Sequence, residues 1–147
     1  MANISCYDML PMPERSKLTD QDYRRLRDFR AGLRRFLRWS EERAAGAGLT
    51  PAQHQLLLSI RASEDPWGPT IRSLSEQLLL KHHSAVELID RAEQAGLVRR
   101  VSDPDDHRVV RLELTADGGR RLARLSSLHL QELARLAPRL GRLWSGL

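Results

Sequence analysis

The stretch from Thr70 to Thr115 most constrains the fold of this chain, because its hydrophobic periodicity changes within a few residues. Apolar residues first recur with the 3.6-residue period of two short helices, which are separated by a turn at Leu79–Lys81. After Gly96 they alternate with a period of two, as in two antiparallel strands joined by the loop Ser102–Arg108. Two helices followed by such a hairpin predict a winged helix-turn-helix, which is a nucleic-acid-binding architecture.

The second helix of this unit is predicted to span His82–Ala95, with Ala85, Leu88, Ile89 and Ala92 as its buried stripe. In helix-turn-helix proteins the N-terminal half of this helix enters the major groove, where short polar side chains reach base edges and phosphates. We therefore expect DNA contacts from polar side chains on this helix and from one arginine of the preceding helix. The candidates are Arg72, His82, His83, Ser84, Glu87 and Arg91.

The loop of the hairpin is acidic and contains a proline, in the run Asp103-Pro104-Asp105-Asp106. Phosphates would repel aspartates that pointed at DNA. We expect them instead to hold the turn through bonds from side chain to backbone and to orient Arg108. Arg108 is the candidate to enter the minor groove, whose narrow width concentrates negative potential.

The positive charge of the chain does not lie in this unit. The whole sequence carries a net charge of +5, whereas residues 70–115 hold seven Lys/Arg against eight Asp/Glu. The basic surplus falls in residues 1–50 and 116–147. DNA binding must therefore rest on individually placed cations rather than on a basic isoelectric point. The arginines that favour it are Arg72, Arg91, Arg99, Arg100 and Arg108.

Helical periodicity on both sides of residues 50–114 predicts two flanking helical regions, 19–47 and 115–147, after an N-terminal arm at 1–18. The apolar positions of the first are Tyr23, Leu26, Phe29, Leu33, Phe36 and Leu37, and those of the second are Leu122, Leu125, Leu128, Leu133 and Leu136. So many leucines at both ends of one domain indicate packing between chains, so we expect a homodimer with intertwined terminal helices. The arginines between the first set are expected to form a solvated face. The fold class is therefore mainly α (α+β).

Local signals fix several boundaries. Thr19 and Thr50 are expected N-caps, and Gln53 completes a capping box with Thr50. The loop Ser63–Pro69 follows, in which Trp67 is expected to be a hydrophobic anchor. Pro138 is expected to break the last helix and leave a final short one.

Several classes of protein are excluded at this level. No apolar run approaches the ~20 residues of a membrane span and no signal peptide is present, so a cytoplasmic location is expected. Cys6 is the only cysteine, which excludes an internal disulfide. The five histidines, His54, His82, His83, His107 and His129, show no metal-ligand spacing, so neither a metal nor a cofactor is expected. No nucleotide loop or nucleophile motif is present, so we predict that the chain is not an enzyme.

The run from Leu49 to about Gly118 resembles the MarR family of bacterial winged-helix transcriptional regulators. The matching elements are LT-x-x-Q at Leu49–Gln53, the helix with Leu74 and Leu78, S-A-V-x-L-I-D-R at Ser84–Arg91, G-L-V-x-R at Gly96–Arg100, D-P-D-D-x-R at Asp103–Arg108 and L-x-L-T-x-x-G at Leu112–Gly118. The order and spacing of these pieces make the resemblance specific.

This resemblance implies a homodimer that binds a pseudopalindromic operator in double-stranded DNA and represses nearby genes. It also implies release by a small aromatic ligand, by thiol oxidation or by metal. Family DNA contacts carry over to His83, Ser84, Glu87 and Arg108. Two positions depart from the family pattern, because Glu87 and His107 stand where many members have arginine. By family analogy, an effector would bind near Trp39 and His54, between the dimer helices and the winged helix.

Two alternatives remain open at this level. The chain could be a winged-helix protein-interaction module without operator binding, which Glu87 and the acidic unit favour. It could also sense redox state through Cys6.

Overall fold

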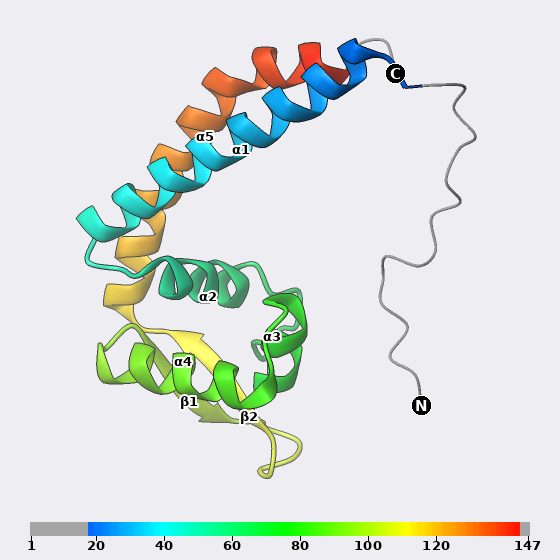
Figure 1. Cartoon of the computed structure of the whole chain (residues 1–147). Helices are drawn as coiled ribbons and strands as arrows, with labels where there is room; N and C mark the ends of the chain where they lie inside the picture. The colour runs from blue at the N-terminus through cyan, green and yellow to red at the C-terminus, as the bar shows by residue number, and fades with distance from the viewer. Residues whose placement is uncertain (1–17, 145–147) are drawn as a thin grey trace.

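The computed structural model describes residues 18–144 of the chain. It contains two long helices, three shorter helices and one hairpin (Figure 1). Their bounds are α1 (Asp20–Gly46), α2 (Pro51–Arg61), α3 (Ile71–Gln77), α4 (His82–Gln94), β1 (Val98–Ser102), β2 (Val110–Leu114) and α5 (Ala116–Trp144). The predicted winged helix-turn-helix, mainly α with a small antiparallel sheet, is confirmed.

The two long helices and the remaining elements form distinct parts of the molecule. Helices α1 and α5 run side by side as an extended arm, whereas α2, α3, α4 and the hairpin gather in a lobe at one end of it (Figure 1). The core of the lobe joins all its elements to the base of α5. Its largest fully buried side chains are Leu56, Leu57, Leu74, Ile89, Leu97, Leu112, Leu125 and Val98.

Threonine caps explain where the first three helices begin. The side chains of Thr19, Thr50 and Thr70 each accept a hydrogen bond from the third helical residue, whose side chain bonds back to the backbone of the cap. Such capping boxes satisfy backbone groups that the first turn leaves unpaired. Helix α4 differs, because Lys81 stands at its N-cap and makes no side-chain capping bond.

Three helices end in Schellman motifs, which need a residue with positive φ directly after the C-cap. Gly48 after α1 has a φ of 71° and Gly96 after α4 has a φ of 70°. After α3 this position is held by Leu79, with a φ of 54°, and the Leu80 N–H donates to the Ser75 carbonyl at 2.9 Å. The helix-turn-helix is thus closed by a leucine in a backbone conformation that usually favours glycine.

The hairpin pairs Val98 with Leu114 and Ser102 with Val110 in antiparallel register. On its other edge, β2 is bound by the loop before α3, because the Leu112 N–H donates to the Pro69 carbonyl at 3.0 Å. The wing is thereby fixed to the helix-turn-helix at its base, while its loop extends away from the lobe (Figure 1).

Two expectations from the sequence are wrong. Helix α5 continues through Pro138, where a break was expected. Pro138 has no backbone N–H, so the carbonyl of Ala134 lacks its usual donor in the helix. Both residues are exposed, so water can donate to that carbonyl. Trp67 is 53% exposed and is not a hydrophobic anchor, because the short loop places its ring outside the core.

Cys6 and nearly all of the expected arm at 1–18 lie outside the described residues, so the redox alternative stays a prediction. Within residues 18–144, no helix combines the length and the apolar composition that a bilayer crossing needs.

Candidate nucleic-acid interface

Helix α4 presents one face to the core and the opposite face to solvent. Its buried stripe is Ala85, Leu88, Ile89 and Ala92, as predicted. Of the predicted DNA-contacting residues, His83, Glu87 and Arg91 are exposed on the outward face and Ser84 is half-buried at its edge. His82 is also exposed, at the first position of the helix. The structure therefore brings the five predicted α4 residues to the accessible part of one helix.

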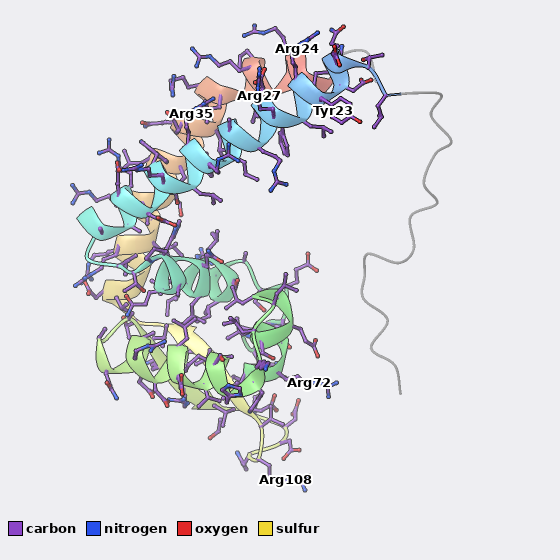
Figure 2. All side chains as sticks on the ribbon, viewed as in Figure 1. Tyr23, Arg24, Arg27, Arg35, Arg72 and Arg108 are labelled. Atoms are coloured by element: carbon purple, nitrogen blue, oxygen red, sulfur yellow. The ribbon has the colours of Figure 1, made fainter. Side chains whose placement is uncertain are left out.

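Arg72 and Arg108 reach outward from the same end of the lobe, one from α3 and one from the wing loop (Figure 2). The Arg72 side chain is 86% exposed and its Nε lies 3.2 Å from Oε1 of Glu76, one helical turn later. The Arg108 side chain is 91% exposed. Both guanidinium groups are accessible to a ligand as large as a DNA duplex.

The aspartates of the wing loop hold the turn, as predicted. The Asp103 carboxylate is buried, and its Oδ1 accepts hydrogen bonds from the backbone of Asp105 at 2.8 Å and of Asp106 at 3.0 Å. Asp106 in turn accepts bonds from Arg108, namely from its backbone N–H at 3.1 Å and from its Nε at 3.0 Å. The predicted orientation of Arg108 by an aspartate is therefore confirmed.

These bonds also set the ionisation of the two carboxyl groups. The backbone N–H groups of Asp106 and Asp105, followed by Arg111, hold the pKa of Asp103 below its ordinary value. The Arg108 side chain, followed by its backbone N–H, lowers the pKa of Asp106. Both groups are consequently charged at neutral pH, and the turn keeps its acceptors.

Arg111 is a structural residue whose role could not be predicted from the sequence. Its side chain is only 15% exposed, and its Nε donates to Asp103 at 2.7 Å. Its Nη1 donates to Asp65 and, at 2.9 Å, to the carbonyl of Gly68. Arg111 thus ties the wing loop to the loop before α3. No sequence signal marks it, because Asp65 lies 46 residues away along the chain.

Two of the arginines counted in favour of DNA binding are occupied within the lobe. Arg99 bonds to Glu113 across the hairpin at 2.7 Å. Arg100 is 28% exposed and bonds to Asp90 at 2.5 Å and to Glu93, both on α4. Arg100 therefore joins the wing to α4 rather than supplying a free cation.

Trp39 and His54, the two residues predicted for effector binding, both pack against the ring of His129. The ring of His129 on α5 lies 4.9 Å from the ring of Trp39 on α1 and 4.8 Å from that of His54 on α2, measured between centroids. Nδ1 of His129 is 2.8 Å from the Leu125 carbonyl, which can only accept, so Nδ1 carries a hydrogen. Nε2 of His129 lies 2.7 Å from the Ser40 hydroxyl, within hydrogen-bond distance.

His54 is 8% exposed within this cluster. Burial, followed by the charge of His129, lowers the pKa of His54. The cluster connects α1 and α5 of the arm with α2 of the lobe, so its packing depends on how the lobe sits against the arm.

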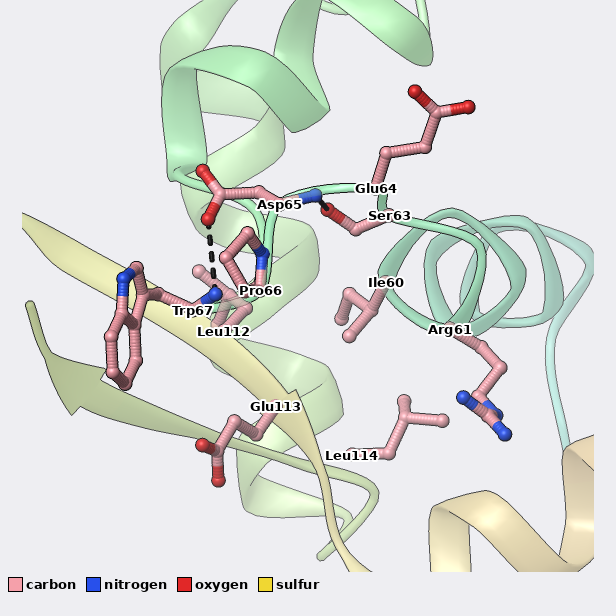
Figure 3. Close-up of a pocket in the computed structure, with 11 residues that line it drawn as sticks. Ile60, Arg61, Ser63, Glu64, Asp65, Pro66, Trp67, Leu112, Glu113 and Leu114 are labelled. Atoms are coloured by element: carbon pink, nitrogen blue, oxygen red, sulfur yellow. Dashed lines mark hydrogen bonds between the residues drawn. The ribbon is translucent and has the colours of Figure 1, made fainter.

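A pocket of about 430 Å³ lies elsewhere, between the end of α2, the 63–69 loop and β2 (Figure 3). The half-exposed ring of Trp67 lines it together with Ile60 and Leu114, whereas Trp39 and His54 do not. The pocket is therefore distinct from the predicted effector position. Within residues 18–144, no group of three or more His, Cys, Asp or Glu side chains is placed to hold a metal ion.

Comparison with known proteins gives a consistent result. The model of the MarR family matches residues 47–109. A curated protein of Bacillus subtilis strain 168, the uncharacterized HTH-type transcriptional regulator YsmB, is 45% identical over 51 residues. That match spans 35% of this chain and 35% of YsmB, about a third of each protein.

Solved structures share the fold over most of the chain. A MarR family protein from Bacillus stearothermophilus is 24% identical, with 89% of this chain and 86% of that chain covered and a TM-score of 0.69. The transcriptional repressor CouR, solved bound to a 23-mer DNA duplex, is 27% identical, with 86% and 92% covered and a TM-score of 0.66. YsmB is described as a transcriptional regulator and CouR as a transcriptional repressor, in agreement with the prediction that the chain is not an enzyme. The family model matches the helix-turn-helix and the first part of the wing, and the solved structures share the fold along the arm, so this chain is similar to MarR family transcription regulators in sequence over residues 47–109 and in fold over most of its length.

Proposed function

We propose that this chain is a homodimeric transcriptional repressor that binds a pseudopalindromic operator and is released by a small aromatic effector. Helix α4 reads the major groove and Arg108 enters the adjacent minor groove. One observation carries the proposal: the outward face of α4 and the wing are held in a fixed relation by Arg100, which bonds from β1 to Asp90 and Glu93 of α4. CouR, with the same fold, is a repressor and was solved on DNA.

The chemistry of α4 suits contacts with both bases and phosphates. His83, Ser84 and Arg91 offer donors for base acceptors and phosphate oxygens, while Glu87 can only accept, as from the amino group of cytosine. No side chain caps the start of α4, so its first backbone N–H groups are available to a phosphate. A carboxylate at this position favours operators with cytosine opposite Glu87.

The wing contributes the guanidinium of Arg108, which can exchange its bond to Asp106 for a contact with DNA. Arg108 bonds to Asp106 in the free protein and is highly exposed, so it can leave that carboxylate for the minor groove. Arg72 of α3 is equally accessible, and it supports the complex through the phosphate backbone.

Dimerisation is supported by apolar side chains that the single chain leaves exposed on its arm. Between 39% and 68% of each of these side chains is exposed to solvent. They are Leu18, Tyr23, Leu26, Leu33, Leu37, Leu128, Leu130 and Leu133. A second copy that covers this surface would place two α4 helices about 34–36 Å apart, one turn of duplex DNA.

The effector would act at the cluster of Trp39, His54 and His129, where arm and lobe meet. An aromatic ligand that displaced these rings would tilt the lobe on the arm and change the distance between the two α4 helices. The proposed binding to an operator supports a cytoplasmic location.

A gel-shift assay with the DNA that flanks the gene tests the proposal. We expect a discrete complex whose affinity falls steeply as salt rises. No complex at low salt, with the dimer intact, would contradict operator binding. That result would favour the second candidate, a protein-interaction module, which the carboxylates of Glu87 and Asp90 on the outward face of α4 support.

A further inference from the structure

The positive charge of this protein lies on the arm and not on the lobe that carries the proposed DNA contacts. Helix α1 carries eight arginines against five acidic residues, and α5 carries six against two. Residues 47–115, which include the whole lobe, hold eight Lys/Arg against ten Asp/Glu. The arm is therefore strongly cationic, whereas the lobe is slightly acidic.

Part of this charge forms a line along α1, which we call the arginine stripe: Arg24, Arg27, Arg35 and Arg38. At 100° per residue these four positions fall within an arc of about 80°, and they extend over about 21 Å of the helix. All four are exposed, and the labelled Arg24, Arg27 and Arg35 point away from the lobe (Figure 2).

The internal ion pairs of the stripe are weak. Arg27 bonds to Asp28 at 2.8 Å and Arg38 lies 3.6 Å from Glu42, but more than half of each side chain is exposed. Such pairs are screened by solvent and exchange readily for another anion. Among residues 18–144, neither Arg24 nor Arg35 is in direct ion-pair contact with a carboxylate. The pKa of Asp28 is nevertheless lowered by its bond with Arg27 and, less strongly, by the charge of Arg35.

The stripe does not serve the stability of α1. Arg24 and Arg27, and likewise Arg35 and Arg38, are like charges three residues apart, an arrangement that weakens a helix. The stripe lies on the side of α1 opposite to Leu33, which belongs to the exposed apolar surface proposed for dimerisation, whereas Tyr23 of the same surface lies one turn before Arg27. In the proposed dimer Arg27 then lies at the edge of the interface, and Arg24, Arg35 and Arg38 stay accessible.

We propose that the arginine stripe is a second DNA-binding surface, which holds the phosphates of another duplex while α4 occupies the operator. A straight line of guanidinium groups over about 21 Å faces about six base pairs of the regular phosphate array of a duplex. Asp28, Ala31 and Glu42, which lie among the arginines, provide no aromatic ring to stack the bases of a single strand. They also provide no large apolar side chain to enter a membrane. The dimer thereby bridges two DNA segments.

A bridging assay tests this surface. The dimer is loaded on an immobilised operator duplex, and capture of a labelled duplex of unrelated sequence is measured at low salt. The test variant carries Arg→Gln at Arg24, Arg27, Arg35 and Arg38, and the matched control carries Arg→Lys at the same positions. We expect capture by the wild type and the Lys variant and at least a tenfold loss in the Gln variant, with operator affinity retained. Equal capture by the Gln variant would overturn the proposal.

A direct measurement separates this proposal from operator binding itself. If no operator is found, the affinity for an unrelated duplex is compared between the wild type and the Gln variant by fluorescence anisotropy. We expect the slope of log affinity against log salt to be shallower by about 3–4 in the variant, because about four phosphate contacts are lost. Unchanged slopes, or stronger binding of single-stranded RNA or anionic vesicles than of duplex, would contradict a duplex-binding stripe.

Discussion

The turn of the helix-turn-helix stores backbone strain that a single substitution should release. Leu79 holds the position after the C-cap of α3 with a φ of 54°, and its side chain is 88% exposed. A left-handed conformation costs an L-residue roughly 1–2 kcal/mol relative to glycine. Leu79→Gly removes this cost and loses almost no buried surface, because the leucine side chain lies in solvent.

Glycine also makes the unfolded chain more flexible, which offsets the gain by about 0.4–1 kcal/mol. The net expectation is an increase of about 0.5–1 kcal/mol in the free energy of unfolding. For a chain of this length, that corresponds to a rise of about 1–4 °C in Tm.

Gly96→Ala is a matched control, for which the opposite change in the free energy of unfolding is expected. Gly96 ends α4 in the same motif with a φ of 70°, and a Cβ there would meet no other atom within 4 Å. Gly96→Ala should therefore lower the free energy of unfolding by about 0.5–1 kcal/mol through backbone conformation alone. Urea unfolding at one fixed protein concentration measures both variants. A destabilised Leu79→Gly variant would refute the release of strain and show that the leucine side chain stabilises the folded protein.

Three further changes probe packing, protonation and the wing. Gly118→Ala should destabilise the fold by about 2 kcal/mol in urea melts, because its Cβ would overlap the Leu97 carbonyl, whereas Gly119→Ala, with open space around it, should not. The pKa of His54 is lowered in the folded state, so the unfolded state takes up more protons below about pH 6.5 and the free energy of unfolding falls there. His54→Gln should make this fall with pH shallower. If the free energy of unfolding of the variant depends on pH between 5 and 7 as it does in the wild type, the buried neutral His54 is not the cause. Asp106→Asn keeps the oxygen acceptor of the turn but frees Arg108, so binding of unrelated duplex should tighten several-fold in anisotropy titrations; weaker binding would count against Arg108 as a DNA contact.

Local patterns in the sequence predicted most of the fold. Thr19 and Thr50 cap the helices where they were expected to, since capping depends only on residues within one turn. The hydrophobic stripe of α4 and the turn-holding aspartates of the wing are equally local. The predicted site residues of α4 are accessible for the same reason, because one buried stripe fixes the opposite face.

Features that depend on distant partners could not be predicted. Arg111 meets Asp65 only because the loop before α3 folds against β2, and His129 joins Trp39 to His54 only where three helices cross. Leu79 adopts a positive φ without the glycine that would have indicated it. Pro138 stays within α5 because the carbonyl of Ala134, which lacks its backbone donor, is exposed to water. The local sequence does not indicate this exposure.

The proposed function requires that α4 and the wing bind the operator together. A hydroxyl-radical footprint of the operator tests this requirement when the wild type and the Arg108→Ala variant are compared at equal occupancy. We expect two protected regions centred one helical turn apart, flanked by minor-groove protection that Arg108→Ala removes while the proposed dimer persists. Absence of protection at low salt, or flanking protection that survives in the Arg108→Ala variant, would contradict joint binding by α4 and the wing.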